Sequence, residues 1–344
     1  MALYNRIDSR ILKEQLLKSK ESRVTLSFYK YHHITGVQAF RDDLFMRWEK
    51  LRVLGRTFVA KEGINSQISV PQNNLEEFRN DLYSISFLNG VRLNIAVDDN
   101  GKSFFKLRVA IRQKIVADGL DVPDFDVTKC GQHVNAEEFN KLASDPNTVI
   151  VDMRNHYESE VGHFKNAICP DADTFREELQ IAEDIMNDHK DKNLLMYCTG
   201  GIRCEKASAW MKYKGFKNVF QLEGGIIRYA WQVKEYNLEN KFIGKNFVFD
   251  ERLSEKITED IISHCHQCGA PADSHTNCKN HGCHLLFIQC EECTRRYDGC
   301  CSTQCQDIIN MPEEKQKELR KGMAQGRMVF KKGRADHLLK IGDR

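Results

Sequence analysis

The sequence predicts a multidomain α/β protein with an α+β domain first, a doubly wound α/β domain in the middle, and a cysteine-rich C-terminal module that ends in a basic tail. Three observations predict this. Strand-like and helix-like patterns alternate in the first third, short apolar runs typical of buried parallel strands follow, and nine of the 13 cysteines fall between Cys265 and Cys305. The predicted parts are residues 1–120, a linker at 121–134, residues 135–238, residues 239–310 and a tail at 311–344.

Charge and hydropathy exclude several classes of protein. Lys and Arg (51) exceed Asp and Glu (49) by only 2, so any surface for nucleic acid must be local. The charged N-terminus has no apolar signal core, and no run of about 18 apolar residues occurs. We therefore expect a cytoplasmic protein without a membrane partner, whose cysteines stay reduced for metal binding or catalysis.

The first domain shows the element order β-α-β-β-α-β after a charged opening helix. The strand VTLSFYKYHHI precedes a helix at 38–53. The segment RTFVAKEGINSQISV then reads as a hairpin, in which Gly63 permits the positive φ of a turn. A helix at 73–83 and a further strand complete the domain. This order predicts a ferredoxin-like fold.

The last strand of that domain, FKLRVAIRQKIV, alternates with period two, so its side chains divide between two faces. The predicted core face carries Leu107, Val109 and Ile111. The opposite face carries Lys106, Arg108 and Arg112. This cationic face is either a solvated sheet surface or a platform for the phosphates of RNA, which require cations but no particular sequence.

The central domain follows a linker that contains Pro123 and a turn at Gly131. The segments TVIVD, NLLMYC and NVFQL are short apolar runs with helices between them. Such runs are typical of parallel strands that are buried on both faces, so residues 135–238 predict a doubly wound sheet.

The segment CTGGIRC places Cys198 at the end of a buried strand and just before a helix. Gly200 and Gly201 let backbone N–H groups turn inward to bind an anion, the helix dipole adds positive potential, and Arg203 supplies a cation. All three effects favour the thiolate, which is the nucleophilic form of cysteine. Cys204 is either a resolving thiol for Cys198 or a small residue that packs the helix.

Two further segments belong with this loop: VDMRNHYESEVGHFKNA and QLEGGIIRYAWQ. With CTGGIR, in that order and spacing, they resemble the rhodanese family over about 100 residues. The resemblance implies that Cys198 carries a persulfide or another covalent adduct. Four residues separate Cys198 from Arg203, as in sulfur-handling rhodaneses, whereas the related phosphatases need five, so a phosphatase is disfavoured.

The C-terminal cysteines occur as CHQC, CKNHGC, CEEC and CCSTQC. Zinc takes four thiolate or imidazole ligands in a tetrahedron, and a C-x2-C turn supplies two of them. We expect two interleaved sites. The first is predicted from Cys265, Cys268, Cys290 and Cys293, and the second from Cys278, Cys283, Cys305 and either Cys301 or Cys300. An iron-sulfur cluster or reversible disulfides are the alternatives to zinc.

After Pro312 the tail carries ten Lys or Arg against five Asp or Glu. It predicts a basic helix with a loose end. Such a tail is either a solvated surface or a contact for the RNA backbone.

The segment AKEGINSQISV, the CTGGIRC loop and the cysteine-rich end together are similar, over nearly the full chain, to bacterial rhodanese-domain tRNA hydroxylases. This resemblance implies tRNA as partner and molecular oxygen as co-substrate, with the wobble uridine converted to 5-hydroxyuridine. Cys198 matches the active-site cysteine of that family. The alternatives are a rhodanese-type sulfurtransferase that carries a persulfide on Cys198, and a non-enzymatic interaction module, against which the intact loop counts.

The chemistry of uracil agrees with a thiolate nucleophile. A thiolate adds to the electron-poor double bond of the base and leaves an enolate at the neighbouring carbon, which oxygen can attack. The sequence contains no flavin or nucleotide motif, and no haem or His-His-carboxylate pattern that would activate oxygen.

Overall fold

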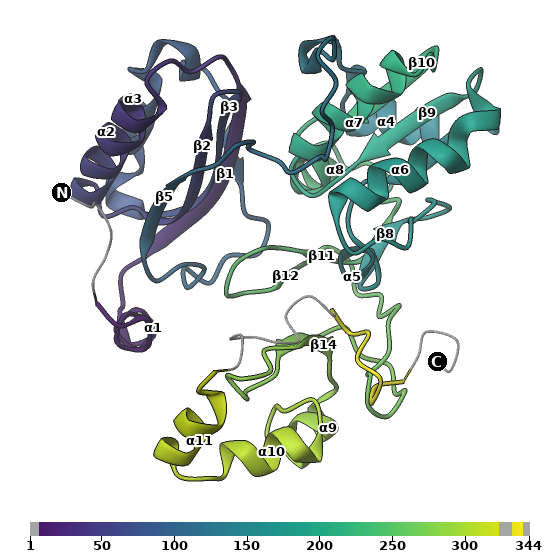
Figure 1. Cartoon of the computed structure of the whole chain (residues 1–344). Helices are drawn as coiled ribbons and strands as arrows, with labels where there is room; N and C mark the ends of the chain where they lie inside the picture. The colour runs from purple at the N-terminus through teal and green to yellow at the C-terminus, as the bar shows by residue number, and fades with distance from the viewer. Residues whose placement is uncertain (1–6, 323–331, 340–344) are drawn as a thin grey trace.

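The computed structural model describes residues 7–322 and 332–339, which form an N-terminal domain, a central domain and a smaller C-terminal module (Figure 1). The helices are α1 (Ser9–Lys18), α2 (Val37–Lys50), α3 (Leu75–Tyr83), α4 (Ala136–Ala143), α5 (His156–Ser159), α6 (Phe175–Met186), α7 (Ile202–Tyr213), α8 (Gly225–Glu235), α9 (Glu291–Arg296), α10 (Thr303–Ile309) and α11 (Glu313–Arg320). The strands are β1 (Arg23–Tyr31), β2 (Leu54–Ala60), β3 (Gly63–Pro71), β4 (Asn94–Ile95), β5 (Leu107–Ile111), β6 (Gln132–Val134), β7 (Thr148–Asp152), β8 (Gly162–Phe164), β9 (Asn193–Tyr197), β10 (Asn218–Leu222), β11 (Phe242–Phe247), β12 (Ser254–Lys256), β13 (His275–Asn277) and β14 (Leu286–Ile288).

The N-terminal sheet has the strand order β4-β1-β3-β2-β5, and α2 and α3 cover one of its faces (Figure 1). On that face Trp48 is fully buried, with its ring 6.3 Å from Phe28 and 5.6 Å from Phe78 between centroids. Each large apolar side chain that is fully buried stabilises the fold by about 2 kcal/mol. The antiparallel order β4-β1-β3-β2 confirms the ferredoxin-like prediction.

The structure corrects this prediction at the fourth strand. The predicted last strand is β5, which adds parallel to β2 at the sheet edge, whereas the two-residue β4 pairs with β1. Leu107 and Val109 are buried in the core as predicted, but Ile111 is 40% exposed. Ile111 is the last residue of the edge strand β5, which has a neighbouring strand on one side only, so its side chain remains partly open to solvent.

The hairpin between β2 and β3 turns at two residues, Lys61 and Glu62, since Ala60 pairs with Gly63. Gly63 has φ +145°, and a Cβ there would lie 2.1 Å from the carbonyl oxygen of Lys30. Only glycine therefore lets β3 approach β1 this closely.

The central domain contains a parallel sheet of order β6-β10-β9-β7. The three predicted strands are β7, β9 and β10. The fourth, β6, lies in the segment assigned to the linker and pairs with β10 at the edge of the sheet. All four strands end on the same edge, and the loop that contains Cys198 leaves this edge between β9 and α7.

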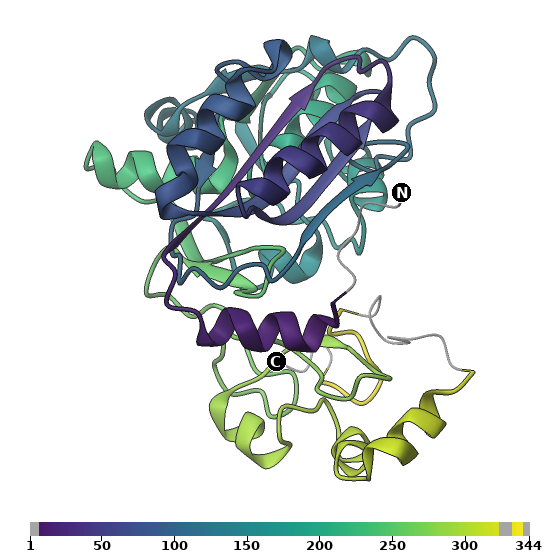
Figure 2. The same ribbon diagram turned by 90° about the vertical axis from the view of Figure 1, so that its left-hand side faces the viewer.

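A second small sheet, β12-β11-β8, joins the central domain to the C-terminal module. Its strand β8 belongs to the central domain, and β11 lies in the segment that leads from that domain into the module. The module itself contains the β13-β14 hairpin and the short helices α9 and α10. In Figure 2, α1 lies across the top of the module. There Lys13 is 2.5 Å from Glu251 and Arg10 is 3.2 Å from Glu313.

The basic tail is partly helical, as predicted, through α11. Residues 323–331 and 340–344 lie outside the described part. Residues 332–339 pack back on the protein: Ala335 and Leu338 are buried beside Cys278 and Cys283, and the Lys332 carbonyl is 3.0 Å from Nε2 of His156. Within residues 7–322 and 332–339, no helix is long and apolar enough to cross a membrane.

Candidate active site and metal-ligand groups

Cys198 lies directly after β9, and its side chain is 1% exposed. The loop rests on the first turn of α8, where the backbone N–H groups of Ile226 and Ile227 donate to the carbonyls of Cys198 and Thr199 (3.0 and 3.2 Å). A Cβ at Gly225 would lie 2.4 Å from the Cys198 oxygen, so the EGGII segment must carry glycine to support the loop.

Several donors converge on the sulfur of Cys198. The backbone N–H of Gly201 is 3.2 Å from Sγ, and the Cys204 thiol and the N–H groups of Arg203 and Cys204 also donate to it. Burial tends to raise the pKa of Cys198, but the Cys204 thiol, the charge of Arg203 and the backbone donors outweigh it and lower the pKa to about 6. The loop therefore holds a thiolate at neutral pH.

The loop predicts a measurable pH dependence. Alkylation of Cys198 by iodoacetamide, followed by peptide mass spectrometry, should be slow below pH 6 and reach a plateau above pH 7, because thiolate forms as pH rises through a pKa of about 6. In Cys204→Ala, which lacks the thiol donor, we expect the midpoint to rise toward the ordinary value of about 8.5. An unchanged midpoint in that variant would contradict the role assigned to Cys204.

Two buried glutamates near the loop were not predicted from the sequence. Glu158, at 0% exposure, pairs with Arg203 through two contacts of 2.6 and 2.9 Å. Burial opposes the charge of Arg203, but Glu158 raises the pKa of Arg203 well above its usual value. Glu178 is fully buried, neither of its oxygens has a hydrogen-bond partner among the described residues, and burial raises its pKa strongly, so it is neutral.

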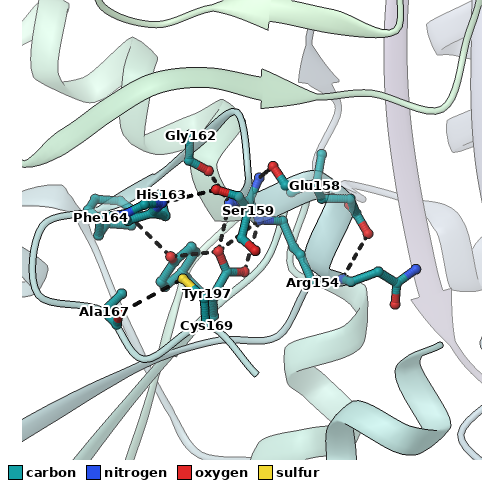
Figure 3. Close-up of polar contacts among 12 residues, drawn as sticks. Arg154, Glu158, Ser159, Gly162, His163, Phe164, Ala167, Cys169 and Tyr197 are labelled. Atoms are coloured by element: carbon teal, nitrogen blue, oxygen red, sulfur yellow. Dashed lines mark hydrogen bonds and ion pairs between the residues drawn. The ribbon is translucent and has the colours of Figure 1, made fainter. Parts of the chain in front are cut away.

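A buried ion pair supports the strand ends beside the loop. Arg154 contacts Asp152 at 2.7 Å and donates to the Gly162 carbonyl at 2.6 Å, while the Tyr197 hydroxyl donates to Asp152 at 2.7 Å. Figure 3 shows Arg154, Gly162 and Tyr197 close together within this set of polar contacts. Because Tyr197 immediately precedes Cys198, this network fixes where the reactive residue leaves the sheet.

A cavity of about 260 Å³ separates Cys198 from the N-terminal sheet. One wall is the CTGGIR loop. The other is the sheet face opposite α2 and α3, and Phe249, from the loop after β11, also lines the cavity. The sheet residues that line it are Ser27, Tyr29, Arg56, Phe58, Asn65 and Gln67.

The strand register arranges these sheet residues in two rows across β1, β3 and β2. The first row is Ser27, Gln67 and Arg56, and it continues to Arg108 on β5. The second row is Tyr29, Asn65 and Phe58. Because residues two apart on a strand share a face, both rows face the central domain.

The predicted cationic residues lie on this same face. Lys106 and Arg108 line a larger groove of about 610 Å³ that shares Arg56 and Phe249 with the Cys198 cavity. The Arg56 guanidinium donates to the Phe249 carbonyl. Arg112 does not line the groove; its guanidinium lies 5.1 Å from the Phe58 ring centroid. The structure thus brings two of the three predicted cations together and adds Arg56.

A hydrogen-bond cluster ties the N-terminal sheet to α7 behind the loop. Glu205 accepts from the Tyr29 hydroxyl at 2.9 Å, and its other contacts include Nε2 of His133 at 2.9 Å and the amide of Gln221 at 3.0 Å. Cys130 completes a group of potential ligands with His133 and Glu205. The hydrogen bonds of Glu205 to Tyr29, His133 and Gln221 indicate that this cluster is a structural contact between the two domains.

The C-terminal cysteines gather in two groups of four whose sulfurs lie within 4.8 Å of one another. One group is Cys265, Cys268, Cys290 and Cys293, and the other is Cys278, Cys283, Cys301 and Cys305. Cys300 belongs to neither among the described residues, although it is buried. All thirteen cysteines are free.

The sulfur spacing fits one tetrahedral ion in each group. A metal with Zn–S bonds of about 2.3 Å places its thiolates about 3.8 Å apart. The distance between Sγ atoms is 3.7 Å for Cys268 and Cys290 and 3.8 Å for Cys301 and Cys305. Either group could therefore hold a single metal ion without rearrangement.

Three family models match successive parts of the chain. Residues 23–115 match the model described as UPF0176 acylphosphatase like domain, 135–232 the rhodanese-like domain, and 243–306 the rhodanase C-terminal model.

Curated relatives match nearly the whole chain. Proteins named tRNA uridine(34) hydroxylase are 55% identical in Pectobacterium atrosepticum (96% of this chain, 94% of the relative) and 55% identical in Enterobacter sp. strain 638 (99% and 98%). The protein of that name in Photorhabdus laumondii is 53% identical (99% and 96%). The chain therefore belongs to the tRNA uridine(34) hydroxylase family.

Proposed function

We propose that this chain hydroxylates the wobble uridine of tRNA at C5, with molecular oxygen as co-substrate, to give 5-hydroxyuridine. The observation that carries the proposal is a thiolate, Cys198, in a cavity of about 260 Å³ beside a cationic groove. A cavity of roughly 150 Å³ holds a benzene ring, so a single pyrimidine fits. Because tRNA is made and used in the cytoplasm, we place the protein there.

In the proposed reaction the Cys198 thiolate adds to C6 of uracil and leaves an enolate at C5 that reacts with oxygen. One oxygen atom enters the base at C5. The peroxide formed at C5 transfers its outer oxygen to the Cys204 sulfur, which leaves a hydroxyl group on C5 and a sulfenic acid on Cys204. Loss of the C5 proton then breaks the bond between C6 and the Cys198 sulfur and restores the double bond. The released Cys198 thiolate attacks the Cys204 sulfenic acid, which expels the second oxygen as water and closes a disulfide. A small thiol then reduces the disulfide for the next turnover.

The contact between the Cys198 and Cys204 side chains supports this division of roles. Burial and the hydrogen bond to Cys198 raise the pKa of Cys204 well above its usual value, so Cys204 stays a thiol while Cys198 is the thiolate. Arg203 and the Gly200 and Gly201 turn hold the anion in place.

The groove next to the cavity supports binding of the anticodon loop. Arg56, Lys106 and Arg108 present cations on one sheet face, which suits phosphodiesters without selecting a sequence. A wobble uridine is already unpaired in the loop, so its extrusion into the cavity costs little. We assign Arg112 and the basic tail to more distant backbone contacts.

We also propose that each group of four cysteines binds Zn²⁺. Four thiolates at tetrahedral spacing are a ligand set that structural zinc prefers, and the first group supplies them from two C-x2-C turns. The ions would hold the C-terminal module together, because the only buried residue of α9 is Cys293 and that of α10 is Cys305.

The function can be tested with purified protein, undermodified substrate tRNA, a thiol reductant and ¹⁸O₂. We expect the nucleoside from position 34 to gain one ¹⁸O atom, detected by mass spectrometry, and no product to form without oxygen. Oxygen derived from water, or no oxygen gain together with a persulfide on Cys198, would contradict hydroxylation, and the second result would indicate sulfur transfer.

A further inference from the structure

We infer that Asn65 and Gln67 recognise uracil by its hydrogen-bonding edge in the Cys198 cavity and so exclude cytosine. This inference rests on the proposed function and adds the residues that select the base. Both side chains come from β3, lie in adjacent rows of the sheet face, and line the cavity across from the reactive loop.

The geometry of the pyrimidine ring decides which edge meets the sheet. C6 and N3 are diametrically opposite atoms of the six-membered ring. The thiolate approaches C6 from one face of the ring, and N3 is the ring atom farthest from C6. The N3 edge, with the substituents at C2 and C4 on either side, therefore extends away from Cys198 along the plane of the base. The cavity wall across from the loop is the sheet face with Asn65 and Gln67 on its centre strand.

Asn65 presents an acceptor. Its side-chain nitrogen donates to the backbone carbonyl of Ile115 at 3.2 Å. A carbonyl can only accept, so this bond fixes the orientation of the amide and leaves the Oδ1 atom to accept from a ligand. The N3–H of uracil is a donor and can bond to Oδ1. The N3 atom of cytosine is an acceptor, so its lone pair would face the lone pairs of Oδ1 and no hydrogen bond would form.

The side-chain carboxamide of Gln67 is available to bond to a ligand. It is half-buried, lies between Ser27 and Arg56 in the first row, and has no side-chain hydrogen bond to any of the residues described in the structure. Its N–H₂ group can donate to the carbonyl oxygen beside N3. The same group would meet the amino group of cytosine at position 4, where two donors oppose each other.

The surroundings make these polar contacts decisive. Phe58 and Phe249 line the cavity with aromatic surface, so a base that enters gives up its water. A site that is built to hydrogen-bond a substrate group rejects an analogue without that group strongly, because the buried partners are left unpaired. Because the base is buried, only uracil, which matches the hydrogen-bonding groups of Asn65 and Gln67, binds well in the cavity.

The test pairs a change in the protein with a change in the base. Substrate tRNA carries either uridine or 3-methyluridine at position 34; the methyl group removes the N3–H donor and leaves C5 and C6 intact. With the wild-type protein we expect 3-methyluridine to be hydroxylated at least 100-fold more slowly, as kcat/KM. Cytidine at position 34 should give no detectable product.

The Asn65→Ala variant should hydroxylate uridine more slowly, and the preference for uridine over 3-methyluridine should fall to within about fivefold, because alanine leaves no acceptor and makes room for the methyl group. Gln72→Ala, an exposed position just after β3, is the matched control and should keep the full preference.

The outcomes separate this inference from the proposed function. If the wild-type protein hydroxylates both bases equally, or if Asn65→Ala slows both by the same factor, the edge is not recognised by Asn65 and the inference is wrong while hydroxylation stands. If wild-type protein does not hydroxylate uridine at all, the proposed function itself fails. The wild-type comparison needs no variant, so a misfolded Asn65→Ala protein leaves the test intact.

Discussion

Cys198→Ser is expected to lower the rate of uridine hydroxylation by about a thousandfold or more. A serine hydroxyl in the same place remains protonated at neutral pH, whereas the loop lowers the pKa of the Cys198 thiol to about 6. Without an anion at this position nothing adds to C6, and C5 does not become an enolate. Single-turnover reactions with nucleoside mass spectrometry measure the loss.

The matched control is Cys169→Ser, which changes a cysteine of the same domain whose Sγ donates to the Ala167 carbonyl at 3.8 Å and which does not line the Cys198 cavity. We expect it to retain full activity. Cys198→Ser should still bind tRNA, because the cations of the groove are unchanged, so the effect belongs to chemistry. Hydroxylation that survives in Cys198→Ser would remove the thiolate from the mechanism.

The second large effect concerns the C-terminal module. We expect the purified protein to contain two zinc ions per chain, and Cys278→Ser to contain one, as measured by inductively coupled plasma mass spectrometry. A structural zinc site contributes on the order of 10 kcal/mol of apparent binding free energy to folding. Its loss should unfold the module, detected as fast amide hydrogen exchange in β13, β14 and α10.

Cys300→Ser is the matched control for the zinc prediction, because Cys300 is buried next to Cys301 but lies outside both ligand groups. We expect this variant to keep two zinc ions. A protein that contains iron with the visible absorption of an iron-sulfur cluster, or that contains no metal and forms disulfides in both groups, would contradict the prediction. Loss of one ion in Cys300→Ser would reassign the ligand.

Local sequence was sufficient where a function depends on residues close together in the chain. The donors to Cys198 lie within six residues of it, so the CTGGIRC segment predicts the anion-binding loop. The same holds for the cysteine pairs, whose members are separated by two to four residues and enter the same ligand group. The interleaved grouping followed from pairing alternate turns, and the structure selects Cys301 in place of Cys300.

Sequence was insufficient where contacts join distant segments. Glu158 lies 45 residues before Arg203 and reads as an ordinary helix-capping glutamate, so its buried ion pair was not predicted. The cavity wall was missed for the same reason. Asn65 and Gln67 alternate with core residues as any half-exposed strand does, and only the docking of one domain on another shows that their face meets Cys198.

The strand assignments illustrate a related limit. β4 and β6 contain two and three residues, which is too few for an alternating pattern to be visible in the sequence. Each forms by backbone pairing with a longer strand, β4 with β1 and β6 with β10. Ile111 alternates correctly but lies at the end of an edge strand, where its side chain remains partly open to solvent. Period alone gives the face of a residue and not the extent of the core.

The order of the cysteines along the chain has a consequence for biosynthesis. Cys278 and Cys283 emerge from the ribosome before Cys290 and Cys293, so the first two pairs are exposed together while the correct partners of both are still missing. An ion captured at that stage would join pairs that belong to different sites. With the zinc ions proposed above, the nascent module has to release an early, mismatched ion or remain unfilled until Cys293 completes the first group and Cys305 the second, and metal supply during translation becomes a determinant of its yield.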